Sequence, residues 1–160
     1  MADHAALVAS ARSGDRTALA RLLSVVERGG RPAHEVGRVV YPLAGAGYTV
    51  GLTGAPGAGK STLTSAVVAT VRGRGERIAV LAIDPSSPYT GGAILGDRIR
   101  MGEHALDDGV FIRSMATRGH LGGLAETTLQ AALVLDAAGK ELLFLETVGA
   151  GQSEVEVIGI

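Results

Sequence analysis

The segment at residues 54–61 reads Gly-Ala-Pro-Gly-Ala-Gly-Lys-Ser and matches the pattern G-x-x-x-x-G-K-[S/T]. An apolar run at 49–53 precedes it, and a helical pattern at 60–72 follows it. Glycines let a backbone wrap around phosphate oxygens with its N–H groups pointing inward, and the helix amino terminus adds partial positive charge. The segment therefore predicts a phosphate-binding loop between a strand and a helix.

The pattern around this loop is a series of short apolar runs that alternate with longer helical stretches, as expected of a parallel sheet. The predicted strands are 49–53, 77–83, 110–112 and 142–145, and the predicted helices are 60–72, 94–104 and 123–138. Two short amphipathic helices within 3–29 and a third from near Pro32 precede them. We expect an α/β fold, with a helical segment at 1–46 and a P-loop domain at 47–160.

Composition limits the possible partners and compartments. The 160 residues carry 15 basic and 16 acidic side chains, and this near-neutral balance excludes nucleic-acid binding by phosphate neutralisation. There is no cysteine, so no disulfide and no cysteine-ligated metal site can form. The start lacks a signal-peptide pattern, and no apolar run is long enough to span a membrane. We therefore expect a cytoplasmic protein with no membrane partner.

Acidic residues follow two of the predicted strands. In a parallel α/β sheet, ligands bind beyond the carboxyl ends of the strands, where Asp84 and Glu146 lie. Glu146 is placed to hold Mg²⁺ with the Ser61 hydroxyl, Gly149 is placed to contact a γ-phosphate, and Lys60 is placed to bridge the β- and γ-phosphates. Alone, either acid is better explained as a strand-end cap or a solvated turn, but the phosphate loop upstream favours the functional interpretation.

Four segments together resemble the MeaB/ArgK-like P-loop GTPases, the metallochaperones associated with methylmalonyl-CoA mutase. They are GAPGAGKST at 54–62, DPSSPYTGGAILGDRIRM at 84–101, FIRSMATRGHLGG at 111–123 and ETVGAGQSE at 146–154. The resemblance covers about residues 15–157. It implies a SIMIBI-type G domain that hydrolyses GTP and helps to load or protect adenosylcobalamin on the mutase.

The resemblance also assigns roles to individual residues. Those that would bind the nucleotide phosphates are Gly54, Ala55, Pro56, Gly57, Ala58, Gly59, Lys60, Ser61 and Thr62. The Mg²⁺ shell and its water contacts would come from Ser61, Asp84, Asp97 and Glu146. Taken alone, Asp97 between two arginines indicates only a surface ion pair. Residues with a catalytic role would be Lys60, Asp84 and Gly149, with Asp84 either orienting water or joining the metal shell.

Family members continue into further strands, an N-K-x-D guanine-binding motif and a helical dimerisation region. The chain contains no asparagine, so that motif is absent from it, and we expect the chain to be the amino-terminal part of a longer protein. Two other functions stay open. One is an ATP-dependent small-molecule kinase, for which Arg98, Arg100 and Arg118 could supply charge. The other is a piece that binds nucleotide without turnover.

Overall fold

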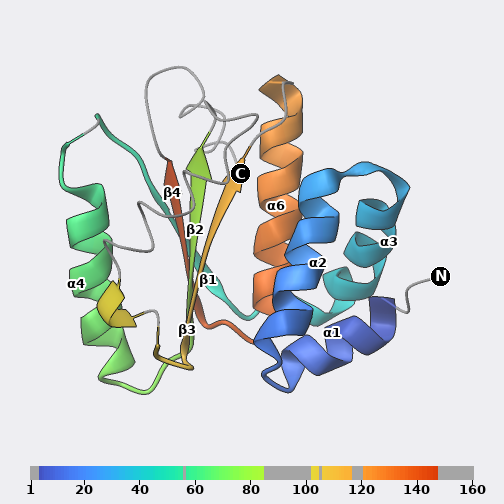
Figure 1. Cartoon of the computed structure of the whole chain (residues 1–160), viewed down its shortest axis with the longest axis horizontal. Coiled ribbons are helices and arrows are strands. Elements are labelled where there is room, and N and C mark those ends of the chain that lie inside the picture. Colours follow the sequence, from blue (N-terminus) through green and yellow to red (C-terminus); the bar gives the residue numbers. More distant parts are fainter. Residues whose placement is uncertain (1–3, 56, 85–101, 105, 117–120, 148–160) are drawn as a thin grey trace.

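The computed structural model describes residues 4–55, 57–84, 102–104, 106–116 and 121–147. At its centre is a parallel four-stranded sheet with the strand order β1-β4-β2-β3. The strands are β1 (Tyr48–Leu52), β2 (Ile78–Asp84), β3 (Val110–Ala116) and β4 (Leu142–Thr147). The predicted α/β architecture is confirmed, and all four strands end at the same edge of the sheet (Figure 1).

Helices cover both faces of the sheet. They are α1 (His4–Arg12), α2 (Arg16–Arg28), α3 (Gly30–Val40), α4 (Lys60–Arg72) and α6 (Leu121–Ala137), with 3-10 turns η1 (Tyr41–Leu43) and η2 (Gly102–His104). Helix α4 covers one face, and α1, α2, α3 and α6 lie on the other (Figure 1). Because a parallel sheet needs cover on both faces, this arrangement buries β2, β4 and most of β3, whereas the edge strand β1 stays largely exposed.

The core follows the alternation of side chains along each strand. On β2, Ile78 and Val80 pack with Val68 of α4, whereas Leu81 and Ile83 pack in the larger cluster with the other helices. A strand directs successive side chains to opposite faces, so one apolar run supplies both layers. The near-continuous apolar run of β2 is thus that of a strand covered on both faces.

The amino-terminal helices share a core with the sheet layer. Leu22 and Leu23 of α2 and Val36 of α3 are fully buried in the same cluster as Leu135 of α6. Asp15 caps α2, since its carboxylate accepts from the backbone N–H groups two and three residues later at 2.8 and 3.1 Å. The division of the chain into 1–46 and 47–160 stays a prediction.

Several element boundaries differ from those predicted. Strand β3 extends to Ala116 instead of ending at 112, and α3 begins at Gly30 instead of near Pro32. Of the helix predicted at 94–104, only 102–104 lies within the described residues, and it forms a 3-10 turn. Among the helices of the described part, none is both long and apolar enough to cross a membrane.

Candidate functional site

The predicted phosphate loop lies between the end of β1 and the start of α4. Gly54, Gly57 and Gly59 have positive φ angles of 144°, 80° and 90°, a backbone region that glycine enters at little cost. Gly59 occupies the N-cap position of α4 and has no side chain to cap the helix. The first-turn N–H groups of α4 therefore meet no capping side chain, and they face the direction from which an anion can approach.

Lys60 is the first residue of α4, and its side chain folds back over the loop. Its Nζ donates to the carbonyl oxygen of Gly54 and, at 3.1 Å, to that of Ala55. The ammonium group is thus held at the mouth of the loop, next to the backbone that would surround a phosphate. A lysine in this place supplies a full positive charge where backbone N–H groups supply only partial charges.

Ser61 and Glu146 meet across the layers, although 85 residues separate them in the sequence. The Ser61 hydroxyl donates to Glu146 Oε1 at 2.5 Å, and Glu146 is only 4% exposed near the end of β4. The side chain of Glu146 faces α4 because its strand alternates, with Phe144 on the same face. The sequence predicts that the Ser61 hydroxyl and the Glu146 carboxylate lie at one edge of the sheet, and the structure brings them together.

Thr64 is a further polar side chain at this site that the motif did not single out. It is fully buried, and its hydroxyl lies 3.0 Å from the Lys60 carbonyl oxygen and 3.4 Å from Glu146 Oε2. A hydroxyl has one hydrogen atom, so the shorter contact is the better hydrogen bond and the longer one adds a second polar neighbour to the carboxylate. The spacing of three residues from Ser61 on one helix face is the sequence signal that could have found it.

The other predicted site residues are described only in part or not at all. Asp84 ends β2, where its backbone pairs in register with Ala116, but its side chain lies outside the described residues. Pro56, Asp97 and Gly149 also lie outside the described part of the chain, as do the arginines at positions 98, 100 and 118. Their roles stay predictions.

The donor chemistry at Ser61 and Glu146 suits a magnesium ion. Mg²⁺ prefers oxygen ligands, and in phosphate sites it commonly uses one or two protein oxygens together with phosphate oxygens and water. A hydroxyl and a carboxylate oxygen lie 2.5 Å apart beside the phosphate loop. Within the described residues there is no group of three or more His, Cys, Asp or Glu that could hold a metal by itself.

Comparison with known proteins identifies the family. The model of the family described as "Methylmalonyl Co-A mutase-associated GTPase MeaB" matches residues 19–160. This chain belongs to the MeaB family. The matched range includes the phosphate loop and both strand ends with acidic residues.

Individual relatives agree with the MeaB assignment. A GTPase candidate of Pyrococcus abyssi is 55% identical over 95% of this chain and 47% of its own length. "GTPase ArgK" of Escherichia coli is 42% identical over 91% of this chain and 45% of its own length. The mouse "Methylmalonic aciduria type A homolog, mitochondrial" is 44% identical over 69% of this chain and 26% of its own length.

A solved structure supports the MeaB-family fold. The crystal structure of "LAO/AO transport system kinase" superposes with a TM-score of 0.74 at 31% identity, covering 98% of this chain and 47% of the other. The chain spans about half the length of the Pyrococcus abyssi and Escherichia coli relatives and of the solved chain, and about a quarter of the mouse relative.

Proposed function

We propose that this chain is the nucleotide-binding part of a Mg²⁺-dependent GTPase that helps to load or protect adenosylcobalamin on methylmalonyl-CoA mutase. The observation that carries the nucleotide part is the contact of Ser61 with Glu146 at 2.5 Å beside the glycine loop that holds Lys60. The mutase part rests on the family description and on the relative named for methylmalonic aciduria.

The proposed roles follow the chemistry of each group. Backbone N–H groups of 54–62 and the Lys60 ammonium bind the phosphates. Ser61 and Glu146 hold the Mg²⁺, together with Asp84 and Asp97. The ion, when bound, neutralises charge that builds up on the phosphate oxygens. Asp84 and Gly149 are assigned to the attacking water and the γ-phosphate, so catalysis consists of positioning and electrostatic stabilisation.

Lys60→Ala tests the phosphate site. In a thermal shift assay with GTP and Mg²⁺, the wild-type chain should gain stability by mass action, and the variant should lose most of that gain. Arg74→Ala is the matched control, because it removes an exposed cation just beyond the other end of the same helix. An undiminished GTP-dependent shift in the Lys60 variant would refute the site assignment.

Glu146→Gln tests the metal part separately. The amide keeps the size of the side chain and one acceptor oxygen but removes the charge, so the Mg²⁺-dependent share of the GTP-induced shift should fall while the Mg²⁺-free share persists. Glu76→Gln, near the opposite end of the sheet, serves as the control. Equal Mg²⁺ dependence in all three proteins would remove Glu146 from the metal site.

Phosphoryl transfer to a small acceptor is the second candidate, because the solved relative is named a kinase. Incubation with γ-labelled GTP or ATP and a metabolite mixture distinguishes the two reactions. Release of labelled inorganic phosphate, increased by methylmalonyl-CoA mutase, supports the proposed GTPase. Label transferred to a small molecule supports the kinase instead. If label is neither released nor transferred, with or without mutase, turnover by this chain is contradicted.

A further inference from the structure

Basic side chains gather at the amino-terminal ends of the strands, opposite the phosphate loop. Backbone hydrogen bonds fix this edge: Ile78 N–H donates to Gly109 O at 2.8 Å, and Glu141 N–H donates to Arg77 O at 2.7 Å. The residues directly before β2, β3 and β4 thus lie side by side. The seven residues of β2 put this edge about 20 Å from the carboxyl ends of the strands, at roughly 3.3 Å per residue.

Two of the cations reach this edge from opposite layers. Arg72, the last residue of α4, forms a bidentate pair with Asp107 at 2.8 and 2.9 Å. Arg16, the first residue of α2, donates from Nη1 to the Asp107 carbonyl oxygen at 3.1 Å, and its guanidinium carbon lies 5.9 Å from the centre of the Phe111 ring. Arg16 is thereby held in place without a carboxylate partner among the described residues.

Two more cations belong to the edge itself. Arg77 lies against Gly139, because a Cβ on that glycine would be 2.9 Å from Arg77 Nη2. Lys140 follows that glycine, and its ammonium group has no ion-pair or hydrogen-bond partner among the described residues. Burial, and then Arg16, Arg77 and Arg72, lower the pKa of Lys140 from 10.5 to about 8.

Two carboxylates lie at this edge, and both already accept hydrogen bonds. Glu141 Oε2 accepts from the backbone N–H of Arg77 at 2.7 Å. Both oxygens of Asp107 bind the Arg72 guanidinium, and Oδ1 also accepts from the Gly109 N–H at 2.8 Å. The bond from Arg72, and then the bond from Gly109, hold the pKa of Asp107 below its ordinary value of 3.8, so the carboxylate stays ionised. Its attraction offsets only part of the repulsion on Lys140. Among the described charged groups that act on Lys140, three guanidinium groups therefore outweigh one carboxylate.

We propose that Lys140, Arg16 and Arg77 form a second anion site, which binds a phosphate dianion either free or as the terminal group of a phosphomonoester. Such a group offers several strong acceptors in one place, and guanidinium and ammonium donors form charge-assisted hydrogen bonds with it. The site lies at the end of the strands opposite the phosphate loop. Its ligand is therefore distinct from the phosphates of the nucleotide in the proposed function.

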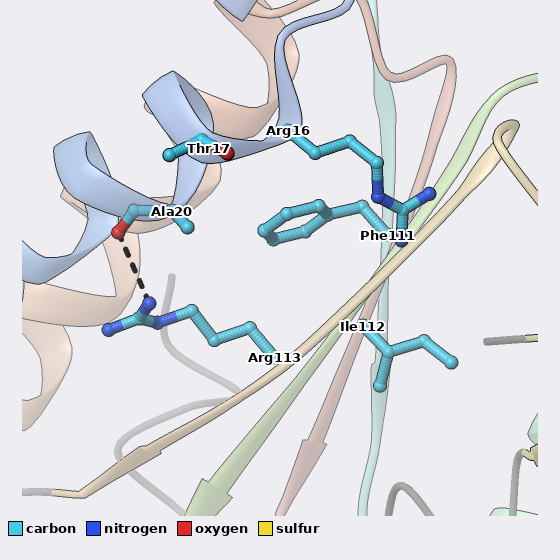
Figure 2. Close-up of a pocket in the computed structure, with 6 residues that line it drawn as sticks. All are labelled: Arg16, Thr17, Ala20, Phe111, Ile112 and Arg113. Atoms are coloured by element: carbon cyan, nitrogen blue, oxygen red, sulfur yellow. Dashed lines mark hydrogen bonds between the residues drawn. The ribbon is translucent and has the colours of Figure 1, made fainter. Parts of the chain in front are cut away.

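A small pocket next to Arg16 gives an ester room for its organic part. The pocket has a volume of about 260 Å³ and lies between α2 and the edge strand β3. Figure 2 shows Arg16 extended over Phe111, while Arg113 reaches from the same strand to Ala20. The lining residues are Arg16, Thr17, Ala20, Phe111, Ile112 and Arg113. Arg16 thus belongs to both the pocket and the cationic edge.

The lysine content of the chain makes a direct test possible. Lys60 and Lys140 are its only lysines, so side-chain-labelled lysine gives two NMR signals, which Lys140→Met assigns. In chloride, the Lys140 signal should titrate near pH 8. In inorganic phosphate at equal ionic strength, the midpoint should rise by about one unit, because an anion favours the charged amine. An unchanged midpoint would overturn the proposal.

Binding is measured in a Lys60→Ala background, which weakens the phosphate loop. By ³¹P NMR, inorganic phosphate should bind this chain at least about tenfold more tightly than the Lys60→Ala/Lys140→Met chain. Lys60→Ala/Arg74→Met is the control for loss of an exposed cation and should bind like Lys60→Ala alone. Tighter binding of phenyl phosphate supports an ester ligand, and equal binding supports free phosphate. Equal affinities in all three chains would refute the site.

Discussion

The ion pair between Arg113 of β3 and Glu27 of α2 ties the amino-terminal helices to the sheet. The two charged groups lie 2.7 Å apart, and their side chains are 20% and 24% exposed. Arg31 and Glu35 of α3 form a pair of similar length, 3.0 Å, but their side chains are 91% and 44% exposed. The chain therefore offers a partly buried ion pair between two elements and an exposed pair within one helix, and a double-mutant cycle on each pair compares their coupling energies.

The expected magnitude follows from the contacts of Arg113. Arg113→Met removes the bond to Glu27 and two further bonds, to the Ala20 carbonyl oxygen at 3.2 Å and to Ser24 Oγ at 3.0 Å. At about 1 kcal/mol for each bond to an uncharged acceptor and about 1.5–3 kcal/mol for the bond to the carboxylate, the loss is about 4 kcal/mol. Arg113 Nε is buried without a hydrogen-bond partner among the described residues. Burial of such a group costs about 1–2 kcal/mol, and methionine at this position removes that cost. A net loss of about 2–3 kcal/mol remains.

The assay is urea unfolding followed by circular dichroism. The cycle of Arg113→Met, Glu27→Gln and the double variant should give a coupling energy of about 1–2 kcal/mol. The cycle of Arg31→Met and Glu35→Gln should give about 0.5 kcal/mol or less, because solvent screens an exposed pair within one helix. Equal coupling energies in the two cycles would show that partial burial does not strengthen the Arg113 pair, and would refute the expected difference.

Three further predictions concern other parts of the fold. Because the pKa of Lys140 is lowered, the folded chain binds fewer protons than the unfolded chain between about pH 8 and 10.5. In chloride, the free energy of unfolding should therefore rise by about 1–2 kcal/mol across that window. Urea unfolding of Lys140→Met should lack this rise. Gly59→Ala, at φ 90°, should lower the melting temperature and the GTP-dependent shift, whereas Gly37→Ala inside α3 should raise stability by about 0.5–1 kcal/mol. Asp136→Ala should cost about 2 kcal/mol in urea unfolding, because two N–H groups of the 44–47 segment lose their acceptor, and Asp136→Asn should cost less.

The sequence predicts the fold best around the phosphate loop. Helix α4 spans Lys60–Arg72, as its pattern predicts, because the glycines before it and the turn after it leave little choice of boundary. Strand β3 shows the opposite case, since Arg113 and Ser114 interrupt the apolar run that marks the strand. The arginine is accommodated there because Glu27, 86 residues earlier, pairs with it. A tertiary contact of this kind has no local signal.

The two ends of the sheet also differ in how far the sequence predicts them. The closeness of Ser61 and Glu146 could be predicted, because a motif places one and the parallel topology places the other at the same edge. The cationic edge could not be predicted in this manner. Its cations come from three separate stretches, and each alone is typical of a solvated surface. They are Arg16, then Arg72 with Arg77, and Lys140. Only the register of the strands and the ends of two helices bring them near one another.

The contacts of Lys60 indicate how the phosphate loop can exchange partners without refolding. Its ammonium group binds the carbonyl oxygens of Gly54 and Ala55, which are neutral acceptors on the loop itself. The ammonium donor is charged in both cases, but a phosphate oxygen also carries negative charge, so attraction between two opposite charges adds to the hydrogen bond. The exchange therefore favours phosphate, and it requires movement of one flexible side chain. Because α4 is also joined to β4 through Ser61 and Glu146, the helix amino terminus can keep its place while the lysine changes partners.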